Sequence, residues 1–210
     1  MGAPKNAIVV GGGLIGLSIA RALTERGLSE VLVLERHQLA SGGTGKSSGI
    51  VRMHYGVPSI AAMAWRSLPA FETLGDEVGF RQVGYCVIVG EENVGPLQAN
   101  TAMHQGLGIE VDLIGPEELQ KLWPMMEVGD VALASYEPRG GFADASQLAL
   151  HFGRKARDRG ARIRQNTPVA RILTSEERVR GVELESGEVV EADLVVVASG
   201  WWSKRLLADL

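Results

Sequence analysis

The sequence predicts an α/β protein in which an α+β segment is inserted into a parallel-sheet domain. An apolar run at 7–10 leads through a glycine turn into an alanine- and leucine-rich helix and a second apolar run at 31–34. A third run, 192–198, is mostly apolar and ends in small residues, as strands buried on both faces of a parallel sheet do. Between these runs, residues 81–136 mix short strands and helices without that regularity.

The first strand is followed by Gly11-Gly12-Gly13-Leu14-Ile15-Gly16, which matches the G-x-G-x-x-G pattern. Gly11 permits the tight turn, Gly13 lets the backbone approach a pyrophosphate, and Gly16 allows the helix to pack closely on the sheet. The helix N-terminus then offers N–H groups and a positive dipole end to phosphates. We therefore predict a Rossmann-like dinucleotide site at this turn.

Glu35 ends the second apolar run, about 20 residues after the last glycine of the motif. A carboxylate there accepts hydrogen bonds from an adenosine ribose and repels a 2′-phosphate. The glycine motif alone does not separate NAD from FAD, so an NAD-dependent dehydrogenase remains an alternative. A near match to a phosphate loop ends in Gly45-Lys46-Ser47. It neither follows a buried strand directly nor opens a helix, so we expect a loop lying against the same cofactor.

Composition favours small molecules as ligands. The chain has 21 Lys and Arg against 25 Asp and Glu, a net charge of −4, which gives no reason to expect nucleic acid or an anionic membrane as a partner. The glycines at 11–16 interrupt the N-terminal apolar stretch, which argues against a secretory signal. No apolar run approaches the ~20 residues of a membrane span. We therefore expect a cytoplasmic protein.

Periodicity and turn residues predict the remaining elements. We expect helices over about 58–74, 91–107, 116–122 and 145–159, and strands over about 81–89, 109–114, 131–136, 161–163, 168–173, 179–184 and 188–190. The strand at 192–200 belongs beside the first one. We assign 1–80 and 141–210 to two parts of one nucleotide-binding domain, and 81–140 to part of a substrate-binding domain.

Several motifs, in this order, resemble the N-terminal half of the FAD-dependent amine and amino-acid oxidoreductases, the family of sarcosine oxidase, dimethylglycine dehydrogenase, glycine oxidase and D-amino-acid oxidase. They are the glycine turn, Glu35-Arg36, the loop ending Ser47-Ser48-Gly49-Ile50-Val51-Arg52, the helix entry at Gly141 to Asp144, Thr167-Pro168-Val169, and Ala198-Ser199-Gly200-Trp201-Trp202-Ser203. The resemblance implies FAD as cofactor and oxidation of a carbon–nitrogen bond in a small amine.

The resemblance also implies the cofactor-binding residues. They are Gly11, Gly13, Leu14, Ile15 and Gly16 at the pyrophosphate, Glu35 and Arg36 at the ribose, Gly43, Thr44, Ser47 and Ser48 toward the ribityl chain, Val169 at the adenine, and Ala198 and Gly200 along the last strand. Arg52 matches an arginine of sarcosine-oxidase-like members and is the candidate for holding a substrate carboxylate. His54 and Tyr55 follow it and are further catalytic candidates.

The sequence departs from the family in three places. Lys46 stands where some members attach FAD through a histidine, so we expect non-covalent FAD. Gly49 stands where some sarcosine oxidases carry another arginine, which leaves the amine open. Family members continue for more than a hundred residues beyond the position of Leu210. A second interpretation is therefore an incomplete flavin-binding fragment or subunit, completed by a partner chain or by self-association through the substrate domain.

Overall fold

The computed structural model describes residues 4–176 and 178–208. The chain divides into two compact units, each described here by itself. Unit 1 contains Met1–Ser47 and Ala145–Leu210, and unit 2 contains Ser48–Asp144. Among the described residues, no helix combines the length and apolar character that crossing a membrane requires.

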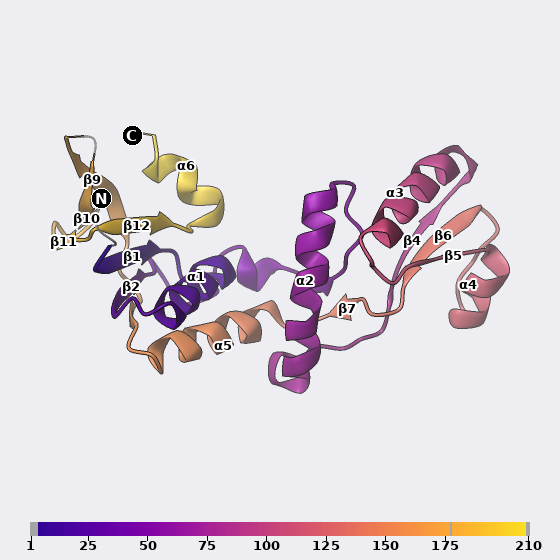
Figure 1. The fold of residues 1–210 in the computed structure, drawn as a ribbon, viewed down its shortest axis with the longest axis horizontal. Coiled ribbons are helices and arrows are strands. Elements are labelled where there is room, and N and C mark those ends of the chain that lie inside the picture. The colour runs from indigo at the N-terminus through magenta and orange to yellow at the C-terminus, as the bar shows by residue number, and fades with distance from the viewer. Residues whose placement is uncertain (1–3, 177, 209–210) are drawn as a thin grey trace. The chain divides into compact units, whose positions relative to one another are not determined.

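The centre of unit 1 is a parallel sheet in the order β12-β1-β2-β8 (Figure 1). Its strands are β12 (Leu194–Val197), β1 (Asn6–Val10), β2 (Glu30–Leu34) and β8 (Arg162–Arg164). Val9 of β1 stands opposite Val196 of β12 and Val33 of β2. The last apolar strand therefore lies beside the first, as predicted.

Both faces of this sheet are covered, which explains why its strands are almost continuously apolar. On one face, Val9, Val31 and Val33 pack with residues of α1 (Leu14–Glu25) and α5 (Ala145–Arg157). On the other, Ile8 and Val10 pack against Val182 and its neighbours in an antiparallel meander. The meander consists of β9 (Val169–Ser175), β10 (Arg178–Leu184) and β11 (Val189–Glu191). Unit 1 also contains three short helical turns, η1 (Thr44–Lys46), η4 (Gly200–Trp202) and α6 (Ser203–Leu206).

Unit 2 is an α+β unit built on an antiparallel sheet in the order β4-β6-β5. The strands of this sheet are β4 (Tyr85–Val89), β6 (Leu133–Glu137) and β5 (Asp112–Ile114). The helices are α2 (Pro58–Leu74), α3 (Val94–Gly106) and α4 (Pro116–Leu122), with short turns at η2 (Gly75–Val78) and η3 (Glu91–Asn93). Ile114, Leu119 and Ala134 form a buried cluster between α4 and the sheet.

Two predicted strands begin three or more residues later than expected, and the strand predicted at 192–200 spans only Leu194–Val197. The strand predicted at 81–89 begins at Tyr85, because Gly84 has φ +79°, and only Arg81 of the earlier residues forms a bridge, with Phe142. The strand predicted at 109–114 begins at Asp112, because Ile109 N–H donates to the carbonyl of His104 and closes the end of α3. In the second case the apolar Ile109 is buried in a turn rather than in a sheet.

The unit boundaries also differ from the predicted domain boundaries at 80/81 and 140/141. Residues 48–80 group with unit 2. The reason is a second antiparallel pair, β3 (Ile50–Val51) with β7 (Gly141–Phe142). Beside it, Ala143 N–H donates to the Gly49 carbonyl at 2.9 Å. The assignment of the two units to cofactor and substrate stays a prediction.

Candidate functional site

At two positions, the glycine turn of unit 1 has room only for a residue without a side chain. Gly11 has φ +114°, and a Cβ there would lie 2.5 Å from the Ala198 carbonyl oxygen. A Cβ on Gly16 would lie 1.9 Å from the Gly11 carbonyl oxygen. The first turn of α1 therefore sits directly on the loop that leaves β1. This is the close packing of helix on sheet that the motif predicts.

Glu35 holds this turn from the end of β2. Its Oε2 accepts a hydrogen bond from Gly12 N–H at 2.7 Å, and its Oε1 accepts one from His37 N–H at 2.9 Å. Gly11 N–H in turn donates to the Leu34 carbonyl at 2.8 Å. The carboxylate is thus fixed beside the glycine turn while the residue remains partly exposed.

The small-residue loop after Arg36 closes over the start of α1. Ala40 N–H donates to the Gly12 carbonyl at 2.9 Å, and Gly45 N–H donates to the Ala40 carbonyl at 2.7 Å. The hydroxyl of Thr44 accepts from Leu14 N–H at 3.0 Å. The loop forms a short turn of helix at Thr44–Lys46 rather than the start of a long one, as expected of a loop that is not a triphosphate-binding loop.

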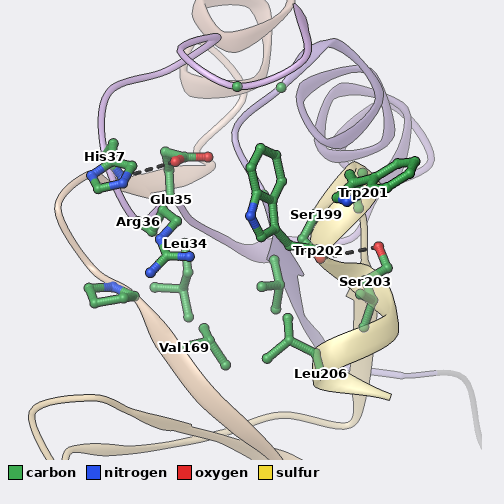
Figure 2. A pocket seen from close by; sticks show the side chains of 18 of the residues that line it. Leu34, Glu35, Arg36, His37, Val169, Ser199, Trp201, Trp202, Ser203 and Leu206 are labelled. Atoms are coloured by element: carbon green, nitrogen blue, oxygen red, sulfur yellow. Dashed lines mark hydrogen bonds between the residues drawn. The ribbon is translucent and has the colours of Figure 1, made fainter. Parts of the chain in front are cut away.

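These segments surround an open cavity of about 960 Å³ that lies wholly within unit 1. Its size is at the upper end of the ~300–1,000 Å³ typical of ligand pockets. Figure 2 shows Glu35, Arg36 and His37 together, with Val169 between them and Leu206, and with Ser199, Trp202 and Ser203 nearby. The predicted residues that line it are Gly11, Gly13, Leu14, Ile15, Glu35, Arg36, Gly43, Thr44, Val169, Ala198 and Gly200.

Three of the predicted cofactor residues are not in the lining. Gly16 is buried behind the turn, where its role is packing. Ser47 is exposed in unit 1, and Ser48 is exposed in unit 2. The lining also contains residues that the motifs did not assign, among them His37, Thr167 and Ser203. His37 lies two residues after Glu35, and that proximity in sequence is the signal that could have pointed to it.

The rim of the cavity carries two tryptophans directly after the last strand. Trp201 is 91% exposed and Trp202 is 44% exposed. Both line the cavity, and Figure 2 shows the Trp202 ring standing among the lining side chains. Behind them, the hydroxyls of Ser199 and Ser203 lie 3.1 Å apart within hydrogen-bonding distance. Large apolar rings in solvent at a cavity mouth are available to cover a bound ligand.

In unit 2, Arg52 lies between two tyrosine rings. Its guanidinium carbon is 5.2 Å from the ring centre of Tyr55 and 5.2 Å from that of Tyr85. A guanidinium nitrogen also donates to the Tyr85 hydroxyl. This hydrogen bond holds the pKa of Arg52 above its usual range. Arg52 is therefore a fixed cation, and Tyr85, an unremarkable strand residue in the sequence, is the partner that positions it.

His54 lies in a different environment from its neighbours. Burial, together with His104 and Arg52, lowers the pKa of His54 to about 4, so the ring is neutral at pH 7. Its ring centre is 5.2 Å from that of His104, which donates from Nε2 to the Tyr55 carbonyl at 2.9 Å. Glu137, fully buried, accepts from Met53 N–H at 2.8 Å, and burial raises the pKa of Glu137.

The comparisons with known proteins identify the family. The family model described as "DAO: FAD dependent oxidoreductase" matches residues 6–210. The chain is 28% identical to sarcosine oxidase subunit beta of an Arthrobacter species, covering 98% of this chain and 53% of that protein. It is 26% identical to human mitochondrial dimethylglycine dehydrogenase, covering 95% of this chain and 23% of that protein.

Among solved structures, L-proline dehydrogenase from P. horikoshii is similar with a TM-score of 0.90 and 28% identity, over 97% of this chain and 55% of that one. The chain thus spans about half the length of this structure and of the sarcosine oxidase subunit, and about a quarter of dimethylglycine dehydrogenase. The cofactor of the family is FAD, which favours FAD over NAD at the glycine turn. The chain belongs to the DAO family of FAD-dependent oxidoreductases.

Proposed function

We propose that the chain binds FAD in the unit 1 cavity and serves the oxidation of a C–N bond in a small secondary or tertiary amine, such as an N-methyl amino acid. The observation that carries the proposal is the cavity itself, lined by the glycine turn, the Glu35 carboxylate and the backbone after the last strand. When bound, FAD supplies the acceptor for a hydride equivalent from the amine carbon.

The lining fits the parts of FAD in turn. The absence of side chains at Gly11 and Gly13, together with the N-terminal end of α1, suits the pyrophosphate. Each oxygen of Glu35 accepts one backbone N–H, and a carboxylate retains further lone pairs for ribose hydroxyls. Val169 gives an apolar edge with its backbone alongside, which suits adenine. Ser47 and Ser48 stay predicted contacts.

On the substrate side, we propose that Arg52 binds a carboxylate. Its partners in the described part of the chain are tyrosines, so its charge is not neutralised by them. Tyr55 and Tyr85 hold the guanidinium plane and thereby orient the substrate. A direct catalytic role for His54 stays a prediction; its Nε2 lies 3.2 Å from Nδ2 of Asn100.

The substrate class follows from what the relatives' names say. The proteins named above act, by their names, on sarcosine, dimethylglycine and L-proline, which are secondary or tertiary amines with a carboxylate. A substrate of this class would place its carboxylate on Arg52. A second candidate function is a flavin-binding part that acts only with a partner chain, which the name "subunit beta" of one relative favours. The cytoplasmic location stays a prediction.

The visible absorption spectrum of the purified chain, before and after acid precipitation, tests the proposal. We expect a flavin spectrum whose colour moves to the supernatant, since Lys46 offers no histidine for attachment. Anaerobic addition of excess sarcosine, dimethylglycine or L-proline should then bleach the visible absorption of the bound flavin, because its reduced form no longer absorbs there. Glu35→Gln should weaken FAD binding about tenfold, by loss of one charged hydrogen bond.

Two other outcomes have clear meanings. A yellow chain that no amine bleaches would favour the partner-dependent candidate. A colourless chain that does not take up added FAD would overturn the proposal for this chain.

A further inference from the structure

Three residues of unit 2 lie close together, and each has a buried polar atom that makes no hydrogen bond to the described residues. His104 and Glu137 are each 0% exposed, and His54 is partly buried beside them. Within the described part of the chain, Nδ1 of His54, Nδ1 of His104 and Oε1 of Glu137 are buried and make no hydrogen bond. The ligand atoms of these residues lie within 4.8 Å of one another. Because a buried polar atom without a hydrogen bond destabilises the fold, this group, the His–Glu cluster, is expected to hold a shared ligand.

The outer atoms of two of these side chains are already fixed. Nε2 of His104 donates to the Tyr55 carbonyl at 2.9 Å, which leaves the lone pair on Nδ1. Oε2 of Glu137 accepts from Met53 N–H at 2.8 Å, which leaves Oε1 facing inward. Metal ligands in proteins are oriented by such contacts: a histidine donates its second ring N–H to a backbone carbonyl, and a carboxylate accepts a hydrogen bond on its second oxygen.

His54 needs one rearrangement to join them. Its Nε2 lies 3.2 Å from Nδ2 of Asn100, so in this orientation Nε2 accepts and Nδ1 carries the hydrogen. Ligation through Nδ1 moves that hydrogen to Nε2. The Asn100 amide then turns so that its oxygen accepts the Nε2 hydrogen, which exchanges the two ends of the amide within the same space.

We propose that His54, His104 and Glu137 form a binding site for one divalent metal ion of the zinc type. Two imidazoles and a carboxylate are a donor set that Zn²⁺ prefers, with water in the fourth position. The ion compensates the negative charge of the Glu137 carboxylate, which is fully buried. Tetrahedral coordination requires ligand atoms about 3.4 Å apart. When the ion binds, the partly exposed His54 therefore moves toward His104 and Glu137. The proposal is independent of flavin binding, because every residue belongs to unit 2.

The experiment is a titration of the full chain, freed of metal by EDTA and dialysed, with ZnCl₂ followed by calorimetry, and with CoCl₂ followed by visible absorption. We expect one equivalent of metal per chain, with Co²⁺ bands of a four-coordinate site. His104→Gln and Glu137→Gln should each weaken zinc binding at least tenfold, as loss of a ligand does. The matched control, His37→Gln, replaces an exposed histidine of unit 1 and should leave zinc binding unchanged.

Asn100→Asp is the variant whose effect on zinc binding only a metal site explains. An aspartate accepts the Nε2 hydrogen of His54 without any turn of an amide, so zinc binding should strengthen several-fold. The X-ray absorption spectrum of the zinc-loaded, unmutated chain should show two imidazoles, a measurement that does not depend on whether a variant folds. A melting temperature raised by zinc should accompany it.

Several results would overturn the proposal. They are no zinc uptake by the metal-free chain, equal uptake by the two cluster variants and the control, or an absorption spectrum with fewer than two imidazoles. Each would assign the cluster to a buried water molecule. Zinc uptake by a chain that takes up no FAD would support the metal site while the proposed function failed, so the two are separable.

Discussion

The two units build their candidate sites from different parts of the polypeptide. In unit 1, the glycine turn beside the cavity is formed by backbone groups and glycines that are neighbours in the sequence, and the Glu35 carboxylate is tied into it. In unit 2, the His–Glu cluster is formed by side chains from segments far apart, those of His54, His104 and Glu137. A backbone site is sensitive to an added Cβ, whereas a side-chain site is sensitive to the loss of a functional group.

Of the substitutions in the two units, Gly16→Ala in unit 1 is expected to have the largest effect. The new Cβ would lie 1.9 Å from the Gly11 carbonyl, and neither backbone segment can withdraw without opening the sheet. We expect a loss of about 2–4 kcal/mol in the free energy of unfolding, with loss of FAD binding. Gly43→Ala is the control, since Gly43 has φ −57° and no described atom lies within 4 Å of a Cβ there. Equal urea midpoints for the two variants would contradict the rigid contact.

In unit 2 the corresponding test compares two substitutions at Glu137. Glu137→Gln keeps an oxygen that accepts the Met53 N–H, whereas Glu137→Leu leaves that buried N–H without an acceptor. We therefore expect the leucine variant to be less stable than the glutamine variant by about 2 kcal/mol in metal-free buffer. Urea unfolding in the presence of EDTA measures the difference. A leucine variant as stable as the glutamine variant would show that the carboxylate does not hold this backbone segment.

Arg52→Lys tests whether unit 1 binds the cofactor and Arg52 of unit 2 binds the substrate, as proposed. Lysine keeps the charge but loses the planar contact with Tyr55 and the hydrogen bond to Tyr85. We expect an unchanged flavin absorption spectrum and about 10- to 100-fold slower reduction by an amino-acid substrate, because the carboxylate is no longer oriented. Anaerobic stopped-flow bleaching measures the rate. A variant that lost its flavin, or that was reduced at an unchanged rate, would contradict the substrate role of Arg52.

The smallest effect concerns the acid stability of unit 2. Both carboxylate oxygens of Glu72 accept hydrogen bonds from Arg139, at 2.8 and 2.7 Å, and this arginine lowers the pKa of Glu72 below its ordinary value of 4.5. The pair therefore stabilises the fold above about pH 4.5, and this contribution disappears as the pH falls through the lowered pKa. Because the pair is partly exposed, we expect only about 0.5–1 kcal/mol.

Glu72→Gln should remove this part of the acid dependence while leaving the stability above neutral pH lower than in the unmutated chain. Thermal unfolding at a series of pH values between about 3 and 7 checks the expectation. An acid slope that is identical in the variant would assign the pH dependence to other carboxylates.

Local signals explain why unit 1 was largely predictable from the sequence. Strand, glycine turn, helix and Glu35 lie within 36 residues, and each follows from short-range chemistry. The strand at 194–197 was placed beside β1 because continuous apolar runs belong to buried parallel sheets. The parallel pairing of β8 with β2 was not predicted, because Arg162 and Arg164 give that strand no buried-strand pattern.

The side-chain sites of unit 2 were only partly predictable. Arg52 was named because it ends a motif of the family that the sequence resembles, and His54 and Tyr55 because they follow it. Tyr85, His104 and Glu137 were not, since nothing in the sequence shows that β4, α3 and β6 bring them to the segment after β3. Glu137 carries one faint signal, a carboxylate at the end of a strand whose neighbours are apolar or small. Contacts between distant segments depend on tertiary packing, which periodicity does not encode.

The pairing of β3 with β7 has a consequence for how such a protein can change over evolutionary time. Ile50 stands opposite Phe142, so the chain enters and leaves unit 2 at adjacent points. A segment whose two ends meet can be exchanged, enlarged or shortened without altering the path of the chain that receives it. Unit 1 can thereby keep the path of its chain while unit 2 is exchanged or enlarged.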